Sequence, residues 1–159
     1  MPKIELITVI EFDKIEVVFD LIRSIDLHKI STKNSKEEAI AGKTKGLISL
    51  NETVTWKAKH LRVTQKLTSK VTDYKFPIFF ADEMQKGAFK GFRHEHYLES
   101  KDGKVIVKDI FDYKSPFGFL GKVADYLFLK SYMKNFLRER NMVIKEYAES
   151  GKWKEVLGR

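Results

Sequence analysis

The spacing of apolar residues predicts a strand and then a short helix at the start of the chain. Residues 3–11 (KIELITVIE) are rich in β-branched side chains and predict the strand, although their alternation is imperfect. The pattern then changes to a helical period, and Asp13 is placed to cap the helix. The apolar positions of this helix are Ile15, Val18, Phe19 and Ile22. A second short helical turn is expected through Leu27.

A long β-rich region follows a polar stretch that is punctuated by glycine. In the polar stretch we expect a short strand near Glu38–Gly42 and a loop through Gly46. From Glu52 to Tyr113 the pattern is that of β-strands broken at turn signals. The expected strands are 52–60, 63–74, 77–86, 89–99 and 104–114. SKDGK, at 100–104, is the clearest hairpin turn.

The C-terminal part of the chain predicts one long helix. Residues 117–148 contain no proline and have glycines only at Gly118 and Gly121, where they allow close packing, and Gly151 ends the helix. This order of elements favours an α+β domain in which a curved seven-stranded antiparallel sheet wraps around the helix, with a cavity between them. We expect residues 1–159 to form a single domain, because the length suits one core and no repeat or linker divides the chain.

Composition narrows the classes of chemistry. Hydrophobic residues make up 43% and aromatic residues 13% of the chain, which is typical of a folded protein with an aromatic core. The absence of cysteine excludes disulfides, thiolate nucleophiles and cysteine-ligated metal centres. Glu5 and Glu11 interrupt the apolar residues of the N-terminus. We therefore expect no signal peptide, no membrane span and a cytoplasmic location.

The formal net charge of +8 raises the question of an anionic partner. In TVTWKAKHL at 53–61 and VTQKLTSKV at 63–71, lysines alternate with apolar or small residues, which is the pattern of the solvent-facing side of a half-buried sheet. These lysines are Lys57, Lys59, Lys66 and Lys70. We expect a solvated basic face and no nucleic-acid partner, with nucleic acid or a membrane surface as the alternative.

Two of the four histidines lie in one expected strand, in the motif FRHEH at 92–96. Alternation places His94 and His96 on the same face as Phe92 and Leu98, and this uncharged set is the better inward face. A two-residue turn at Leu61–Arg62 would pair strand 52–60 with strand 63–74. The inward face of this pair is also apolar with a few polar atoms. Its members are Val54, Trp56, Ala58, His60, Val63, Gln65 and Leu67.

The hairpin at 100–103 suggests a carboxylate partner for one histidine. Pairing Glu99 with Lys104 places His96 opposite Val107 and His94 opposite Asp109. Directly opposite residues are within reach of a hydrogen bond, so we expect Asp109 to orient His94 and to raise its pKa.

Three interpretations of this histidine cluster are open. It is a satisfied buried polar network, a set of polar anchors in an apolar ligand pocket, or a catalytic or metal centre in which His94 acts as a general base or Asp109 completes a two-His-one-carboxylate set. His60 is expected about 14 Å away, at about 4.8 Å per strand, and so lies outside a shared metal site. His28 is expected at the surface or at the pocket entrance. We expect no metal and no cofactor.

Four stretches resemble the START-like superfamily, also called the helix-grip or SRPBCC proteins. They are IDLHKIS at 25–31, ETVTWKAKH at 52–60, FRHEH at 92–96 and KDIFDYKSPFGFLG at 108–121. The chain is similar to the bacterial branch of small ligand-binding and polyketide cyclase/dehydrase-like proteins. The superfamily includes lipid carriers, hormone receptors, chaperone-binding modules and aromatase/cyclases, so the resemblance implies the fold more specifically than the function.

Together these observations predict a pocket for a small hydrophobic or aromatic molecule, such as a lipid or a polyketide-like compound. The candidate ligand-binding residues are Trp56, His60, Gln65, Phe92, His94, His96, Asp109 and Phe111, with Tyr113 as a further wall residue. The alternative is a cyclase/dehydratase-type enzyme that uses His94 with Asp109 as its acid/base pair.

Overall fold

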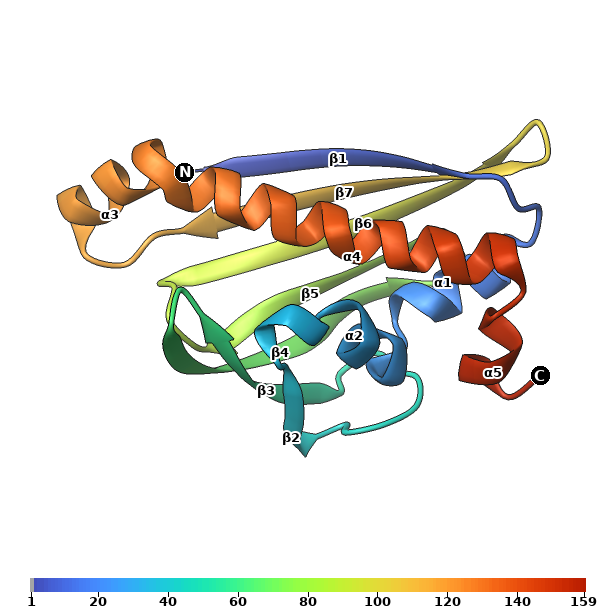
Figure 1. Ribbon diagram of the computed structural model, residues 1–159, viewed down its shortest axis with the longest axis horizontal. Coiled ribbons are helices and arrows are strands. Elements are labelled where there is room, and N and C mark those ends of the chain that lie inside the picture. The colour runs from blue at the N-terminus through green and yellow to red at the C-terminus, as the bar shows by residue number, and fades with distance from the viewer. Residues whose placement is uncertain (1) are drawn as a thin grey trace.

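A seven-stranded antiparallel sheet carries the fold in the computed structural model, which describes residues 2–159 apart from the side chain of Asp125 (Figure 1). The strand order is β1-β7-β6-β5-β4-β3-β2, so the first and last strands are neighbours. The strands are β1 (Lys3–Ile10), β2 (Glu38–Gly42), β3 (Thr53–His60), β4 (Val63–Lys75), β5 (Phe79–Lys86), β6 (Gly91–Lys101) and β7 (Lys104–Lys114). The expected helix-grip architecture is confirmed.

Three short helical segments connect β1 to β2. They are α1 (Ile15–Ile22), α2 (Ile25–Ser31) and the 3-10 turn η1 (Lys33–Ser35). The apolar stripe of α1 is buried as expected, but the predicted cap was wrong: Lys14 is the N-cap residue, and no side chain caps the helix. The second helix has the side-chain cap that the first lacks, because the Ser24 hydroxyl accepts a hydrogen bond from the Leu27 N–H at 3.1 Å.

The long C-terminal helix is less uniform than the sequence predicts. It consists of α3 (Gly118–Ala124), a π-helical turn η2 (Asp125–Leu129) and α4 (Lys130–Ser150), and α5 (Trp153–Leu157) follows. A side chain at Gly121 would place its Cβ 1.9 Å from the carbonyl oxygen of Pro116, so only glycine fits this close approach. Gly151 ends α4 in the left-handed conformation, with φ of 85°.

Two tight turns set the register of the sheet. Leu61–Arg62 and Asp102–Gly103 have positive φ at both residues, as two-residue hairpin turns require. Because Asp102 and Gly103 alone form the second turn, Lys101 pairs with Lys104, and the predicted pairing of Glu99 with Lys104 was wrong. All the other pairs between β6 and β7 are therefore shifted by two residues from the predicted ones. His96 lies opposite Asp109, and His94 lies opposite Phe111.

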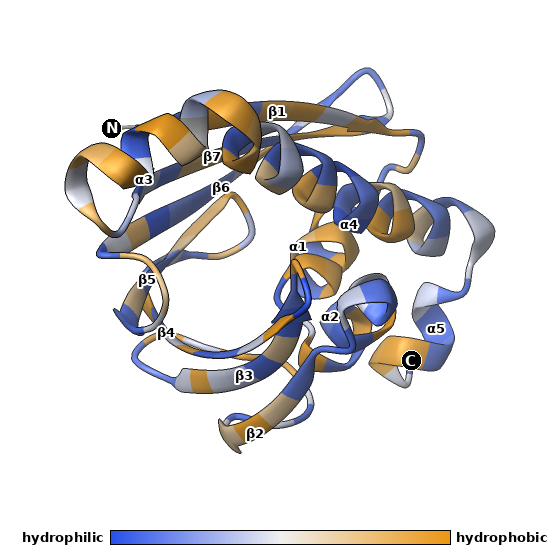
Figure 2. Cartoon of the chain, turned by 60° about the vertical axis from the view of Figure 1, so that its left-hand side comes forward, coloured by the Kyte–Doolittle hydropathy of each residue, from blue (hydrophilic) through white to orange (hydrophobic). Residues whose placement is uncertain are grey.

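The α4 helix covers the concave face of the sheet and is held at β1 and α1. Asn141 donates to the Thr8 hydroxyl at 3.2 Å, and Lys145 donates to the Val9 carbonyl at 2.6 Å. Figure 2 shows the sheet curving from β1 to β2, with α1, α2 and α4 on its open side. The larger core cluster joins these helices to the sheet, and a smaller one lies beneath the first turns of α4. Among the described residues, no helix has the length and apolarity needed to cross a bilayer.

Candidate functional site

A cavity of about 290 Å³ lies between the concave face of the sheet and α4. The predicted wall residues Trp56, Phe92 and Phe111 line it from three different strands. The opposite wall comes from the helix and consists of Leu129, Met133, Phe136 and Leu137. Apolar side chains thus face the cavity from both the sheet and the helix.

Four predicted polar residues also line the cavity, but they form no single group. His94 and His96 lie together on β6, whereas His60 and Gln65 lie on the β3–β4 hairpin. Two other predicted residues do not line it. Asp109 is 2% exposed and lies behind the two histidines. Tyr113 is fully buried and packs against other aromatic rings.

Asp109 holds both histidines with one oxygen. Its Oδ1 accepts from His94 Nε2 at 3.0 Å and from His96 Nδ1 at 2.8 Å, while its Oδ2 accepts from the Asn141 amide at 2.6 Å. The predicted His94–Asp109 contact is present, although it is diagonal rather than directly across the strands. A carboxylate only accepts hydrogen bonds, so each of these two ring nitrogens carries a proton. The second ring nitrogen of His94, Nδ1, is then unprotonated and has no hydrogen-bond partner among the described residues.

The two histidines are held in different charge states. Burial and the neighbouring charge of His96 lower the pKa of His94 to about 4, in spite of Asp109. Asp109 acts to raise the pKa of His94, as predicted, but the expected net rise was wrong, because desolvation and the charge of His96 outweigh the carboxylate. Burial also opposes the charged form of His96, but the hydrogen bonds that it donates to Asp109 and Asp82 raise its pKa. The surroundings therefore favour the neutral form of His94 and the charged form of His96.

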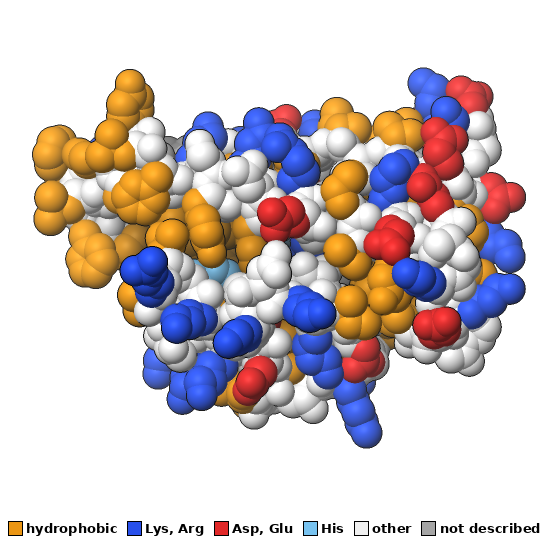
Figure 3. Space-filling view, in the orientation of Figure 1, with side chains coloured by type: hydrophobic (Ala, Val, Ile, Leu, Met, Phe, Trp, Pro, Cys, Tyr) orange, Lys and Arg blue, Asp and Glu red, His pale blue; other side chains and the backbone are white. Residues whose placement is uncertain are grey.

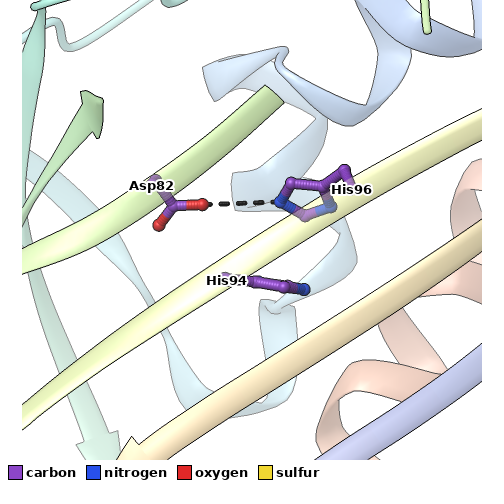
Figure 4. A group of neighbouring side chains, drawn as sticks. All are labelled: Asp82, His94 and His96. Carbon is purple, nitrogen blue, oxygen red and sulfur yellow. Dashed lines mark hydrogen bonds and ion pairs between the residues drawn. The ribbon is translucent and has the colours of Figure 1, made fainter. Parts of the chain in front are cut away.

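Asp82 is a site residue that the sequence analysis missed (Figure 4). It lies directly opposite His94 in the β5–β6 pairing, and its Oδ1 is 3.4 Å from His96 Nε2. Burial alone would raise the pKa of Asp82, but the hydrogen bond with His96 and the charges around it lower that pKa. The sequence held a signal for this residue, since alternation from Phe80 puts Asp82 on the inward face of its strand.

Arg140 completes the charge balance of this group. It lines the cavity from α4, is 6% exposed and donates to the Ile22 carbonyl at 3.2 Å. The buried carboxylate of Asp109, whose pKa lies well below its ordinary value despite burial, and that of Asp82 face two cations, His96 and Arg140. With His96 in its favoured charged form, these two negative and two positive charges balance. We call Asp82, His94, His96, Asp109 and Arg140 the histidine–aspartate group.

The same group contains the atoms that could hold a metal. Asp82, His94 and His96 each offer a ligand atom, and these atoms lie within 4.8 Å of one another. Asp109, the hypothesised third ligand, is not in this set; its Oδ1 is bonded to His94 Nε2 and to His96 Nδ1, whereas Asp82 lies on the Nε2 side of His96. A carboxylate behind the histidines is the usual outer shell of a metal site. A divalent metal would take the place of the His96 proton, since a ligating imidazole is neutral.

A second polar group lies in the cavity wall at the β3–β4 hairpin. Glu37, in the loop before β2, lies 2.6 Å from His28 Nε2 and 3.4 Å from His60 Nε2. Nδ1 of His60 is 2.9 Å from the Tyr132 hydroxyl on α4. Burial would raise the pKa of Glu37, but the charge and hydrogen bond of His28, helped by His60, lower it to about 2. This Glu37 group therefore ties α2, β3 and α4 together.

His28 lies in this group at the cavity wall. Its ring is 4.3 Å from that of Trp56, and both side chains line the cavity. The pocket-entrance alternative thus describes its place better than a surface position. Glu37 and Tyr132 were missed, because Glu37 follows a loop without periodicity and Tyr132 is one of many aromatic residues on a helix.

The comparisons with known proteins give structural neighbours only. No family model and no curated protein matches the chain. A crystal structure of a Thermus thermophilus protein superposes with a TM-score of 0.77 at 12% identity, over 94% of this chain and 99% of the other. Ginseng major latex-like protein 151 from Panax ginseng gives 0.67 at 14% identity, over 92% and 97%.

A START superfamily protein from Mycobacterium smegmatis gives a TM-score of 0.70 at 9% identity, over 93% of this chain and 97% of that one. Each neighbour matches nearly the full length of both chains, so the likeness covers the sheet, the short helices and the long helix together. At these identities the likeness concerns architecture. The chain has the START-like, or SRPBCC, helix-grip fold.

Proposed function

We propose that this protein binds a small, mainly apolar molecule in the cavity between the sheet and α4. The observation that carries the proposal is an apolar cavity of about 290 Å³ into which two separate polar groups point. Small-molecule sites commonly have this composition, with apolar walls for affinity and a few polar groups for orientation. The fold supports the proposal because the superfamily that the sequence resembles includes carriers and receptors of such molecules. We also propose that the protein is cytoplasmic.

The charge balance of the histidine–aspartate group sets the polarity of the ligand. Asp82 offers an acceptor at the cavity, Arg140 offers donors, and His94 offers a neutral ring nitrogen. The group has no net charge to neutralise an ion, and an unpaired charge is costly in a buried site. We therefore expect the ligand to carry a neutral group, such as a hydroxyl, carbonyl or amide, rather than a carboxylate.

The two tryptophans allow a direct test of binding. Trp56 lines the cavity, whereas Trp153 lies in α5 and does not. In a Trp153→Phe variant, Trp56 is the one remaining tryptophan, and its fluorescence reports on the cavity. We expect titration with fatty alcohols, flavonoid-like aromatics and polyketide fragments to produce saturable changes for some of them. An unchanged Trp56 signal with every compound, in a folded variant, would contradict the proposal.

A cyclase or dehydratase activity is the second candidate, and the free Nδ1 of His94 at the cavity favours it. His94 remains neutral above its pKa of about 4, so it can accept a proton at neutral pH, although as a weak base. The rate should then rise through pH 4 rather than near 6.5. Turnover that is lost in His94→Gln while Trp56 still reports binding would support the enzyme. Binding without turnover would support the carrier.

A further inference from the structure

The segment from Phe117 to the end of η2 exposes a group of large apolar side chains. Phe117 is 80% exposed, Phe119 is 77% exposed and Tyr126 is 91% exposed. The complete set, which we call the α3 patch, consists of Phe117, Phe119, Leu120, Val123, Tyr126, Leu127 and Phe128. Figure 3 shows apolar side chains gathered over α3 at one end of the molecule. Scattered exposed apolar residues are ordinary, but a contiguous patch marks an interaction surface.

The α3 patch borders the side on which the cavity reaches the surface. Pro116 precedes the patch and Leu129 follows it, and both line the cavity. Across the opening, Leu61 also lines the cavity and is 52% exposed. The hydrogen bond of 2.9 Å between His60 and Tyr132 fixes the β3–β4 turn near the start of α4. A partner that covers the α3 patch therefore also lies over the cavity opening.

Basic residues accompany this end of the molecule. Residues 53–72 contain no acidic residue, and residues 113–137 contain only Asp125. The basic residues of the two segments are Lys57, Lys59, Arg62, Lys66, Lys70, Lys114, Lys122, Lys130 and Lys134. None of these nine forms an ion pair among the described side chains, whereas Lys145, Lys152 and Arg159 near the C-terminus do. In Figure 3, lysine and arginine side chains gather below the apolar group.

We propose that the α3 patch and its basic surroundings dock the protein on an anionic lipid bilayer, with the cavity opening toward the lipid. Aromatic and leucine side chains enter the boundary between head groups and acyl chains, and unpaired lysines bind the anionic head groups. A second copy of the chain fits the surface less well. A two-fold contact through the patch would bring the basic residues of both copies together, and like charges would repel. This docking goes beyond ligand binding and does not depend on what the cavity holds.

Sedimentation with lipid vesicles tests the docking. We expect the protein to bind phosphatidylcholine vesicles that contain phosphatidylglycerol, to bind pure phosphatidylcholine much less, and to be released by salt. Phe119→Ser with Leu120→Ser should abolish binding, and Lys59→Glu with Arg62→Glu should weaken it at least about tenfold. The matched controls lie elsewhere on the surface. Ile7→Ser with Val9→Ser replaces exposed apolar residues of β1, and Lys101→Glu lies at the β6–β7 turn; both should bind normally.

Insertion of the helix can be measured separately from adsorption. A Phe119→Trp variant should be quenched by brominated lipids in anionic vesicles, beyond the quenching seen for the two natural tryptophans. Ile7→Trp should show no such increase. These results together would support docking through the α3 patch.

Three results would overturn the proposal. One is absence of binding to anionic vesicles. Another is binding that the Phe119→Ser/Leu120→Ser variant retains. The third is a dimer in solution, dispersed by that same variant, with no vesicle binding, since the patch would then be an interface between copies.

Discussion

Asp109 accepts a hydrogen bond from His94 at 3.0 Å, yet the pKa of His94 is lowered to about 4. The carboxylate stabilises a charged imidazole, but burial and the positive charge of His96 act more strongly in the opposite direction. The result is a fixed neutral ring whose Nε2 donates and whose Nδ1 is free to accept. His94 is therefore better suited to orient a ligand than to titrate near neutral pH.

The pKa of His94 predicts an acid-sensitive stability. The unfolded chain binds a proton at this residue below about pH 6.5, whereas the folded chain does so only below about 4. Stability is therefore lost as the pH falls through this window, by at most about 3 kcal/mol. His94→Gln, which keeps a donor for Asp109, should lose less stability than the wild type between pH 6.5 and 4 in urea unfolding. Equal losses in both proteins would contradict the assignment.

His96 should behave in the opposite way. Its folded pKa is raised, so its contribution to stability is present below pH 6.5 and is lost as the pH rises through the folded pKa. Histidine resonances measured by NMR should show His96 charged at pH 6.5 and His94 neutral. The reverse order of the two titrations would exclude the charge assignment.

Removal of Asp109 should be costly for folding. Asp109→Ala leaves the buried His96 cation without its closest partner and should destabilise the protein by about 3–5 kcal/mol. Asp112→Ala, on the same strand, is the control, because Asp112 Oδ1 is buried without a hydrogen-bond partner. That variant should be close to neutral, within about 0.5 kcal/mol. Urea unfolding at pH 7 compares the two, and a loss below about 1 kcal/mol for Asp109→Ala would show that the network is dispensable.

The Glu37 group should stabilise the fold above pH 4.5. The pKa of Glu37 is lowered from 4.5 to about 2, so its contribution is present above the first value and is lost as the pH falls toward the second. Glu37→Gln should cost about 1–3 kcal/mol at pH 7 and progressively less as the pH falls below 4.5. A cost that does not depend on pH would mean that packing, and not charge, explains the effect.

The apolar and the polar residues that line the cavity should affect ligand binding differently when they are substituted. Phe92→Ala removes apolar contact and should weaken every ligand that binds. Asp82→Asn should selectively weaken ligands whose donor group faces Asp82, by about 1–3 kcal/mol. Titration of the compound panel in the Trp153→Phe background measures both variants. Uniform losses across the panel for both would remove the distinction.

Periodicity predicted the architecture well and the site in part. Alternation along β3 and β6 placed Trp56, His94 and His96 on inward faces, because strand geometry fixes side-chain direction locally. The predicted register of β6 against β7 was wrong by two residues, because register depends on the length of the turn and not on alternation. Asp82 was missed although alternation from Phe80 places it on an inward face, because its meeting with His96 depends on the pairing of β5 with β6. Arg140 was missed because the crossing of α4 over the sheet, which the local sequence does not encode, brings it to the cavity.

Native mass spectrometry of the purified protein tests the central claim most directly, when it is combined with a variant that fills the cavity. Ala58 lines the cavity from β3, whereas Thr64 on β4 is exposed and points away from it. We predict that the wild type and Thr64→Phe retain an added small-molecule mass, from copurification or from incubation with the compound panel. Ala58→Phe, still folded, should lose that mass. An added mass that persists in Ala58→Phe, or no added mass in any of the three proteins, would contradict ligand binding in this cavity.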